Sequence, residues 1–325
     1  MNTWGEEERE AVLSVVDSGR LTSGERVQQF ERAFAQYVGA RYAILVNSGS
    51  SANLLAISAL SHHPESPLRA GDEAIVPAIA WATTYAPIHQ HGLKLKVLDV
   101  NLDTLNMNVA ELKSALTPKT QLLVGVSILG NPANLDLMRE FADEHGLWFL
   151  EDNCESMGAT LNGRQTGTFG DIGTYSMFFS HHLNTIEGGV LVTEDRTIYE
   201  TALCLREHGW SRCLKPDGGR YEFLYPGYNL RPTEITAAVG LVQLEKLDAQ
   251  LAQRRKNAEM FRDMFSDSGY LLQRPNGNPS WFGFTMIGGV RPDGIEHRMI
   301  TRGCFSRHPA ADWYDWSAID TLPNA

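Results

Sequence analysis

Residues 42–60 read YAILVNSGSSANLLAISAL, and the stretch changes character in the middle. Its first six residues form an apolar run that ends in an asparagine, which predicts a short buried strand at 42–47. The small residues SGSS follow at 48–51, and LLAISAL at 54–60 then predicts a helix. A strand that turns directly into a helix is the repeating element of an α/β fold.

Further apolar segments of strand length follow this stretch along the chain. They are Glu73–Pro77, Lys94–Val100, Gln121–Ser127 and Leu147–Asp152. Helical patterns lie between them, at 83–91, 108–116 and 134–146. This alternation predicts a mostly parallel sheet with helices on both faces. Ligands in such folds bind beyond the carboxyl ends of the strands, so the polar residues that close each strand are candidate site residues.

The pattern changes after Pro232. Residues 233–265 predict one long or kinked helix, and a turn rich in Gly, Pro and Asn at 274–279 leads to a strand-like WFGFTMI at 281–287. We expect a large domain at 20–230 and a smaller α+β domain at 231–325. A helix at 6–18, ended by Gly19, lies in residues 1–19, which are a candidate further part of the smaller domain.

The composition is that of a soluble globular protein, with 43% hydrophobic and 21% charged residues among 325. A net charge of -11 argues against nucleic-acid and anionic-membrane partners. No apolar stretch reaches 18 residues, and the acidic N-terminus does not resemble a signal peptide. We expect a cytoplasmic protein without a disulfide framework, because its cysteines are widely spaced: Cys154, Cys204, Cys213 and Cys304.

Three strand ends carry residues whose chemistry leaves two interpretations open. Ser48–Ser51 precede a helix and suit either a phosphate site or an ordinary helix cap. Trp81 follows a strand and suits either stacking on a flat ring or core packing. Asp152 closes an apolar strand, where its carboxylate suits either a salt bridge or cap, or the protonated nitrogen of a cofactor ring.

Two adjacent histidines, His181 and His182, suggest a metal site at first. Neighbouring side chains point away from each other on strands and do not face each other on helices. No Cys, His or Asp set near them has ligand spacing, so we expect no metal. The sequence from Thr120 to Leu214 also contains no lysine.

Several stretches, in this order along the chain, resemble the DegT/DnrJ/EryC1/StrS sugar aminotransferase family, which has fold type I of aspartate aminotransferase. The resemblance runs from about residue 8 to residue 265. It includes NSGSSANLL, GDEAIVPAIAWATT, EDNCESMGA, GTFGDIGTYSMFFS, EGGVLVT, LREHGW and GYNLRPTEITAAVGLVQLEKL.

The resemblance implies that the chain binds pyridoxal phosphate or pyridoxamine phosphate. Trp81 would stack on the pyridine ring, Asp152 would pair with its nitrogen, and Glu155 would lie near its 3-hydroxyl. Asn229 would reach the phosphate in a neighbouring subunit, which implies a homodimer with shared active sites. The residues implied for the phosphate of the same subunit are Gly49, Ser50, Ser51 and Ser176.

The sequence departs from most of the family at one decisive position. Most members read SKNLTTGEGG, with a lysine that binds the cofactor covalently, whereas residues 180–189 read SHHLNTIEGG. His181 thus replaces the lysine, as in the 3-dehydratase subgroup that makes 3,6-dideoxysugars. The resemblance implies a nucleotide-linked 4-keto-6-deoxyhexose as substrate. A histidine cannot form a Schiff base, but it titrates near neutrality and suits a general base. His208 is a candidate second substrate contact, or a capping or packed histidine.

Two routes are known for this subgroup. One needs an iron–sulfur cluster with several cysteines close together after the HGW motif, and a reductase partner. Here only Cys213 follows that motif, with Cys204 before it. We therefore expect no cluster, and regeneration of pyridoxamine phosphate from L-glutamate.

Two other functions are weighed against dehydration. An aminotransferase is disfavoured by the missing lysine. An inactive binder of the same fold is disfavoured because Trp81, Asp152, Ser176 and Glu187 are all retained. The sequence leaves the nucleotide open among GDP, CDP and dTDP, and leaves the stereochemistry of the sugar open.

The C-terminal segment ITRGCFSRHP, at 300–309, resembles a loop that lies near the substrate in the family. The substrate contacts it implies are Arg302, Ser306, Arg307 and His308. Family members usually continue for several tens of residues more. We therefore expect a truncated small domain and a stability below that of longer relatives.

Overall fold

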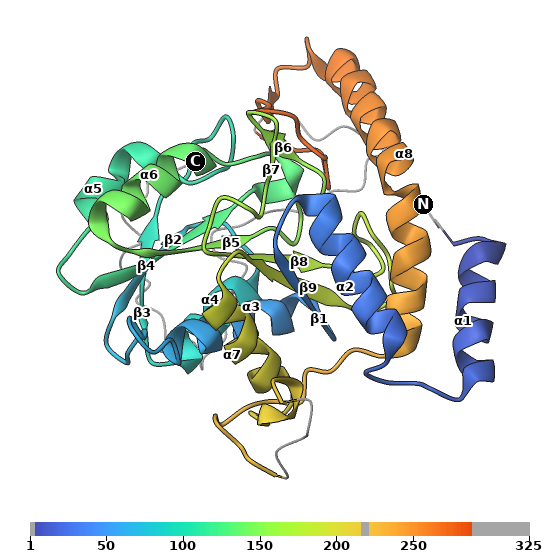
Figure 1. Cartoon of the computed structure of the whole chain (residues 1–325). Helices are drawn as coiled ribbons and strands as arrows, with labels where there is room; N and C mark the ends of the chain where they lie inside the picture. The colour runs from blue at the N-terminus through green and yellow to red at the C-terminus, as the bar shows by residue number, and fades with distance from the viewer. Residues whose placement is uncertain (1–3, 216–220, 288–325) are drawn as a thin grey trace, which may run out of the picture.

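A seven-stranded sheet lies at the centre of the computed structural model, which describes residues 4–215 and 221–287 (Figure 1). The strand order is β1-β9-β8-β5-β4-β2-β3. β9 runs antiparallel to both of its neighbours, and every other neighbouring pair is parallel. The predicted mostly parallel α/β sheet is therefore confirmed. The strands are β1 (Tyr42–Val46), β2 (Glu73–Pro77), β3 (Lys94–Leu98), β4 (Thr120–Val126), β5 (Trp148–Asp152), β8 (Ile172–Ser176) and β9 (Gly189–Thr193).

The sequence patterns did not predict β8 and β9 as strands. Both contain glycine, which weakens the pattern of a strand. The packing requires those glycines: a Cβ at Gly173 would collide with the carbonyl of Gly167, and one at Gly189 with the carbonyl of Ser48. The second approach matters for the site, because it brings β9 against the turn that follows β1.

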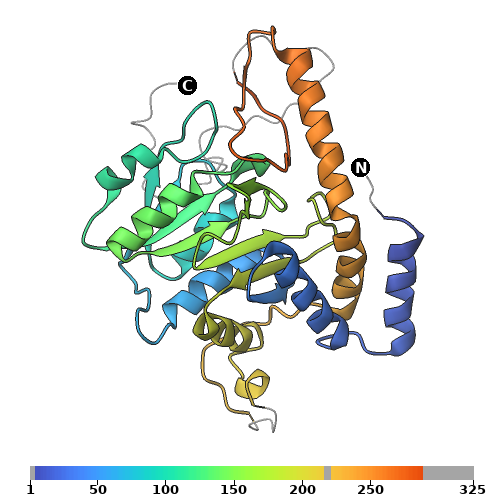
Figure 2. The same cartoon turned by 45° about the horizontal axis from the view of Figure 1, so that its top comes forward.

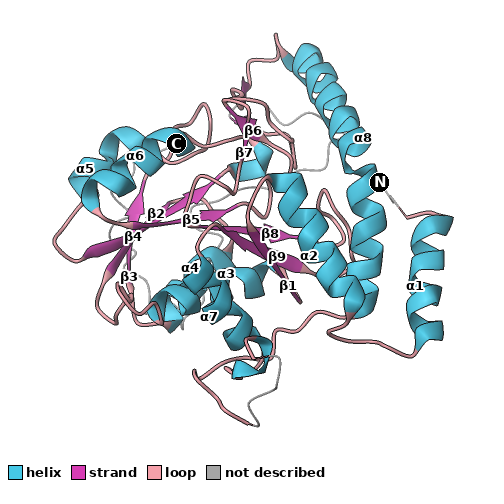
Figure 3. Ribbon diagram, viewed as in Figure 1, coloured by secondary structure: helices cyan, strands magenta, loops and turns pink. Residues whose placement is uncertain are grey.

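Helices cover both faces of the sheet, as predicted (Figure 3). One face packs against α3 (Gly49–Ser61), α4 (Ala82–Gln90) and α7 (Arg196–Arg206). The other packs against α2 (Glu25–Val38), α6 (Leu135–His145) and α8 (Glu234–Phe265). The expected helix at 108–116 is a 3₁₀ turn, η1 (Val109–Glu111), followed by one α-helical turn, α5 (Leu112–Ala115). Within the described ranges, no helix has both the length and the apolar character to cross a bilayer.

The long helix α8 is continuous, and α1 (Glu6–Ser18) packs along it (Figure 2). The buried carboxylate of Glu8 joins the two, because its Oε1 accepts from Gln243 Nε2 at 2.6 Å and from Lys246 Nζ at 2.7 Å. The division into domains at 20–230 and 231–325 stays a prediction, and residues 288–325 lie outside the described part of the chain.

The expected strand at 281–287 is wrong over most of its length. Only Met286–Ile287 form a strand, β11, which pairs with β10 (Leu271–Leu272). Trp281 has a positive φ of 51°, which interrupts the extended backbone. The N–H of Phe282 instead donates to the carbonyl of Leu129 at 2.8 Å. This segment therefore attaches to the loop after β4, beside the carboxyl ends of the strands.

The 280–282 segment also covers His182, which is 1% exposed and whose Nε2 lies 3.2 Å from the carbonyl of Ser280. Burial lowers the pKa of His182 to about 3, and the nearby cation of Arg254 acts in the same direction. The imidazole is therefore neutral in the folded protein at neutral pH.

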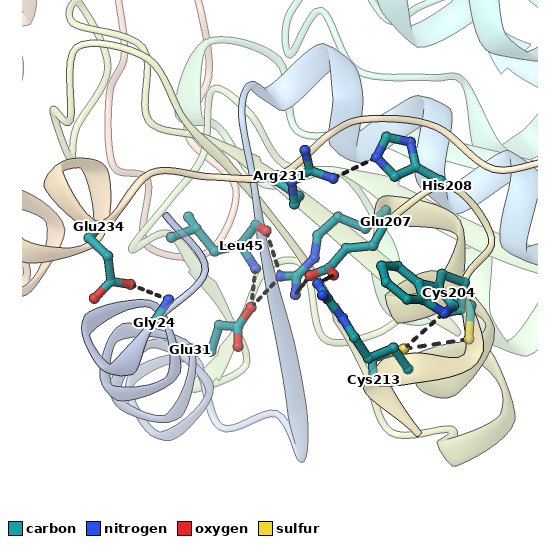
Figure 4. Close-up of polar contacts among 12 residues, drawn as sticks. Gly24, Glu31, Leu45, Cys204, Glu207, His208, Cys213, Arg231 and Glu234 are labelled. Atoms are coloured by element: carbon teal, nitrogen blue, oxygen red, sulfur yellow. Dashed lines mark hydrogen bonds and ion pairs between the residues drawn. The ribbon is translucent and has the colours of Figure 1, made fainter. Parts of the chain in front are cut away.

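Strand β1 is an edge of the sheet, and a buried ion pair occupies its outward side (Figure 4). The N–H of Leu45 donates to Glu31 Oε1 at 2.9 Å, and its carbonyl accepts from an Arg206 guanidinium nitrogen at 3.0 Å. The same nitrogen of Arg206 lies 2.8 Å from Glu31. Helices α2 and α7, which carry the two side chains, are thereby fixed to the edge strand.

We expect Glu234→Ala to lower the free energy of unfolding by about 2–3 kcal/mol, because one buried carboxylate holds the start of α2. Its oxygens accept from the backbone N–H of Gly24 at 2.8 Å, which Figure 4 shows, and from those of Arg26 at 3.0 Å and Val27 at 3.1 Å. Urea unfolding measures the change. Glu259→Ala, at an exposed position of the same helix, is the matched control and should change stability by less than about 0.5 kcal/mol. Equal losses in both variants would contradict the capping role.

His182→Gln should make stability less sensitive to acid. In the unfolded chain a histidine takes up its proton near pH 6.5, but His182 in the fold does so only near pH 3. The neutral form of His182 thus makes its full contribution to the free energy of unfolding above pH 6.5. This contribution is lost as the pH falls toward 3. Below pH 6 the wild type should lose about 1 kcal/mol per pH unit more than the variant. Urea titrations between pH 7 and pH 5 measure this, with the exposed His89→Gln as control. Parallel curves for wild type and His182→Gln would refute it.

Candidate functional site

The carboxylate of Asp152 lies at the carboxyl end of β5 and is 5% exposed. Its Oδ2 accepts from Thr84 Oγ1 at 2.6 Å and from Asn53 Nδ2 at 2.8 Å, and its Oδ1 from the N–H of Cys154 at 3.2 Å. Among the residues that the structure describes, no lysine or arginine forms an ion pair with it. A buried carboxylate held by neutral donors alone is suited to a cationic ligand.

The first turn of α3 lies next to this carboxylate. Ser48 is the N-cap, and its Oγ accepts from the N–H of Ser51 at 3.1 Å. Ser50 Oγ lies 2.7 Å from Thr83 Oγ1 at the start of α4. A Cβ at Gly49 would lie 2.6 Å from the Cβ of Ser176, at the end of β8. The predicted phosphate residues of two strand ends are thus brought together at a helix N-terminus, where backbone N–H groups favour an anion.

Trp81 and Glu155 lie at the margins of the same site. Trp81 precedes α4 and is 64% exposed, so its ring adds little to the core and is available to a ligand. Glu155 Oε2 accepts from the N–H of Leu129, after β4, at 2.9 Å. Burial raises the pKa of the Glu155 carboxyl.

His181 follows β8, and its ring packs 4.9 Å from that of Phe282. Burial lowers its pKa to about 4, while the charge of Asp152 acts in the opposite direction. Because the charge of Asp152 affects the pKa of His181, the imidazole and the carboxylate are close enough to interact electrostatically. Its Nδ1 is buried and has no hydrogen-bond partner among the residues described. The site therefore holds a neutral imidazole with an uncommitted nitrogen.

The structure places His208 and Asn229 on the loop region after α7. His208 Nε2 lies 2.6 Å from an Arg231 guanidinium nitrogen, and the side chain is exposed (Figure 4). Asn229 is exposed and forms a backbone bridge with Glu207. Their predicted roles toward the substrate and a neighbouring subunit remain predictions. The predicted substrate contacts Arg302, Ser306, Arg307 and His308 lie outside the described residues.

The described cysteines lie in two places. Cys154 lies beside the site, where its Sγ would be 2.9 Å from a Cβ at Gly49, whereas Cys204 Sγ and Cys213 Sγ lie 3.5 Å apart near the end of α7 (Figure 4). Over residues 4–215 and 221–287, no group of three or more His, Cys, Asp or Glu residues is arranged to hold a metal ion. The expected lack of an iron–sulfur cluster stays a prediction.

These residues fit pyridoxal phosphate and its amine form. The close approach at Gly49 brings Ser176 to the N-terminus of α3, where backbone N–H groups suit a phosphate, and within the described residues Asp152 has no cationic ion-pair partner. His181 stands where the resemblance places the family's lysine, and its buried Nδ1 has no hydrogen-bond partner among the described residues. Sequence reasoning overlooked Asn53 and Thr84, although both stand inside the motifs NSGSSANLL and WATT.

The chain is similar in sequence to two proteins named as 3-dehydratases. A GDP-4-keto-6-deoxy-D-mannose 3-dehydratase from Yersinia pseudotuberculosis is 44% identical over 299 residues, which is 88% of this chain and 76% of the relative. A protein of the same name from Escherichia coli O55:H7 is 43% identical over the whole chain and 90% of its own length.

Solved structures give the same result. A structure described as E. coli GDP-4-keto-6-deoxy-D-mannose-3-dehydratase with bound hydrated PLP matches with a TM-score of 0.85 and 44% identity, over 91% of this chain and 79% of that one. A GDP-4-keto-6-deoxymannose-3-dehydratase with a trapped PLP-glutamate geminal diamine also matches with a TM-score of 0.85, over 91% and 80% of the two chains. The fold is therefore the predicted fold type I, and the predicted cofactor is supported. The model of one family matches residues 2–297, and the chain belongs to it: the DegT/DnrJ/EryC1/StrS aminotransferase family.

Proposed function

We propose that this protein is a pyridoxamine phosphate-dependent 3-dehydratase. It removes the C3 hydroxyl of a nucleotide-linked 4-keto-6-deoxyhexose in dideoxysugar biosynthesis. The observation that carries the proposal is His181, a neutral and uncommitted imidazole near Asp152 at the position of the family's lysine. The identities of 44% and 43% to two 3-dehydratases support it.

The residues of the site bind and orient the cofactor. The first turn of α3 and the hydroxyls of Ser50, Ser51 and Ser176 would hold its phosphate, and Trp81 would cover one face of its ring. The carboxylate of Asp152 would hold a proton on the ring nitrogen, which strengthens the ring as an electron sink. When bound, the amine form of the cofactor supplies a nitrogen for the C4 ketone and a ring that withdraws electrons as the C3 hydroxyl leaves.

His181 is the base of the site. The sequence led us to expect a histidine that titrates near neutrality, but burial lowers the pKa of His181 to about 4. Nearly all of the imidazole is therefore unprotonated at neutral pH and can accept a proton, although it is a weaker base than a free imidazole. The proton to be moved is the one on C4′, the carbon that joins the cofactor's amine to its ring. A lysine at this position would bind the cofactor covalently, whereas a histidine leaves the amine free to react with the sugar.

The proposal extends to the nucleotide of the sugar substrate and to the amino donor. The relatives at 44% and 43% identity are named for a GDP-linked sugar, so GDP-4-keto-6-deoxymannose is the proposed substrate. A structural relative was trapped with a PLP-glutamate adduct, which supports L-glutamate as the donor that regenerates the amine form.

We propose a homodimer in which the loop that carries Asn229 contributes to the site of the neighbouring subunit. Large apolar side chains are exposed on this loop: Tyr221 is 74%, Phe223 56% and Leu224 46% exposed. Others are exposed near the site, where Phe179 is 62% and Ile186 53% exposed. Apolar surface of this kind is typical of protein–protein contacts. Analytical ultracentrifugation of the wild type should give twice the chain mass, and a monomer at micromolar concentration would contradict the shared site.

His181→Gln should lower the rate of 3-deoxy sugar formation by about 100-fold or more, because the base is lost. Cofactor affinity should change little, since the phosphate, ring-face and ring-nitrogen contacts remain. The assay combines pyridoxal phosphate, L-glutamate and GDP-4-keto-6-deoxymannose, and measures the 3-deoxy product and ammonia by mass spectrometry. His145→Gln, at the end of α6, is the matched control and should retain the wild-type rate.

The same assay separates the alternative functions. If the wild type adds an amine to the sugar and releases no ammonia, it is an aminotransferase. If it binds neither form of the cofactor, it is an inactive binder. If His181→Gln still turns over at the wild-type rate, His181 is not the base.

A GDP-linked 4-keto-6-deoxyhexose should have a kcat/KM at least about tenfold above its CDP- and dTDP-linked counterparts. Specific hydrogen bonds to guanine would be left unpaired by a pyrimidine, which is the physical reason for this discrimination. Initial rates with the three nucleotide sugars measure it. Equal rates would limit the proposal to a 3-dehydratase without a GDP preference.

A further inference from the structure

The two oxygens of the Asp152 carboxylate have unequal surroundings. Oδ2 accepts two short hydrogen bonds, from Thr84 Oγ1 at 2.6 Å and Asn53 Nδ2 at 2.8 Å. Oδ1 accepts a longer one, from the N–H of Cys154 at 3.2 Å, and the Cys154 thiol also hydrogen-bonds to the carboxylate. We propose that Thr84 and Asn53 are positioning residues that hold Oδ2, so that Oδ1 faces the ring nitrogen of the cofactor. This inference rests on the cofactor chemistry proposed above.

The orientation of Asn53 is itself fixed. Its Oδ1 accepts from the hydroxyl of Thr174, on β8, at 2.6 Å, so its Nδ2 must face Asp152. Asn53 and Thr84 are each 2% exposed and Thr174 is 0% exposed. Water therefore does not compete for these hydrogen bonds, and the low local dielectric strengthens them.

The two positioning residues also belong to the turns that carry the other cofactor contacts. The N–H of Thr84 donates to the carbonyl of Trp81 at 2.9 Å, so the two residues share the first turn of α4. Asn53 lies one turn after Ser50 on α3, and Ser50 contacts Thr83 at 2.7 Å. The orientation of the Asp152 carboxylate is thus coupled to Trp81, the proposed contact of the cofactor ring, and to Ser50, a proposed contact of its phosphate. The coupling runs through the first turns of α4 and α3 and the hydrogen bonds between them.

A carboxylate that is free to rotate would present either oxygen to the ring nitrogen at a varying angle. A hydrogen bond weakens steeply as its angle departs from linearity, so proton retention on the ring would suffer before any contact was lost. The hydroxyl of Thr84 makes a hydrogen bond of 2.6 Å to Asp152, shorter than those from Asn53 and the N–H of Cys154, so its removal should have the largest effect on the ring nitrogen.

Thr84→Val tests the inference, because it removes the hydroxyl and nearly preserves shape. Pyridoxal phosphate alone is the probe. Equilibrium dialysis gives its dissociation constant, and the nitrogen NMR shift of ring-labelled cofactor reports whether the ring nitrogen is protonated. We expect the dissociation constant to rise about tenfold or more and the protonated fraction at pH 8 to fall. Thr84→Ser, which keeps the hydroxyl, should restore both values.

Matched variants complete the experiment. Thr193→Val removes another buried hydroxyl, which donates to the carbonyl of Asp171 at 2.7 Å at the opposite end of the strands, and it should change neither value. Asp152→Asn gives the shift of an unprotonated ring. Should Thr84→Val fail to fold by circular dichroism, Thr84→Ala replaces it, since a smaller side chain introduces no clash.

The inference would be overturned if Thr84→Val or Thr84→Ala kept the wild-type dissociation constant and the wild-type nitrogen NMR shift. It would also be overturned if Thr84→Ser showed a raised dissociation constant and an unprotonated ring. These measurements contain no sugar. A wild type that binds cofactor with a protonated ring but forms no 3-deoxy product would refute the dehydratase and leave the role of Thr84 intact.

Discussion

One buried charge sets the positions of the elements around the site. The carboxylate of Asp152 is 5% exposed, and a buried carboxylate that lacks hydrogen-bond donors costs several kcal/mol. Its donors come from the start of α3, the start of α4 and the backbone after β5. These segments must therefore converge at the carboxyl ends of the strands. The helix N-terminus that suits a phosphate and the exposed Trp81 arrive there through the same convergence.

In the proposed function, one residue, His181, changes the chemistry of a shared fold. A lysine there would offer a primary amine that reacts with an aldehyde, whereas an imidazole offers only a nitrogen lone pair. Burial keeps that lone pair unprotonated, because it lowers the pKa of His181 to about 4. The surrounding scaffold of strand ends, helix N-terminus and carboxylate does not have to change for the outcome to differ.

Sequence patterns predicted the parallel strands, because each is an apolar run bounded by turns. They also singled out polar and aromatic residues that the structure places around the carboxyl ends of the strands, such as Asp152 and Trp81. They did not reveal β8 and β9, whose glycines are required by close backbone approaches that only the fold creates. Thr84 was missed for a similar reason: nothing local distinguishes it from Thr83, and only the packing of α4 against β5 brings it to Asp152.

The ion pair of Glu31 and Arg206 on strand β1 has a consequence for how copies of the chain can meet. An exposed edge strand is a template for strand addition, the route by which sheets of separate molecules join and aggregate. At Leu45 both outward backbone groups are already taken, and the N–H of Asn47 donates to the carbonyl of Leu230. An incoming strand finds no continuous row of free groups along this edge. Copies of the chain therefore do not associate by an extended sheet across β1.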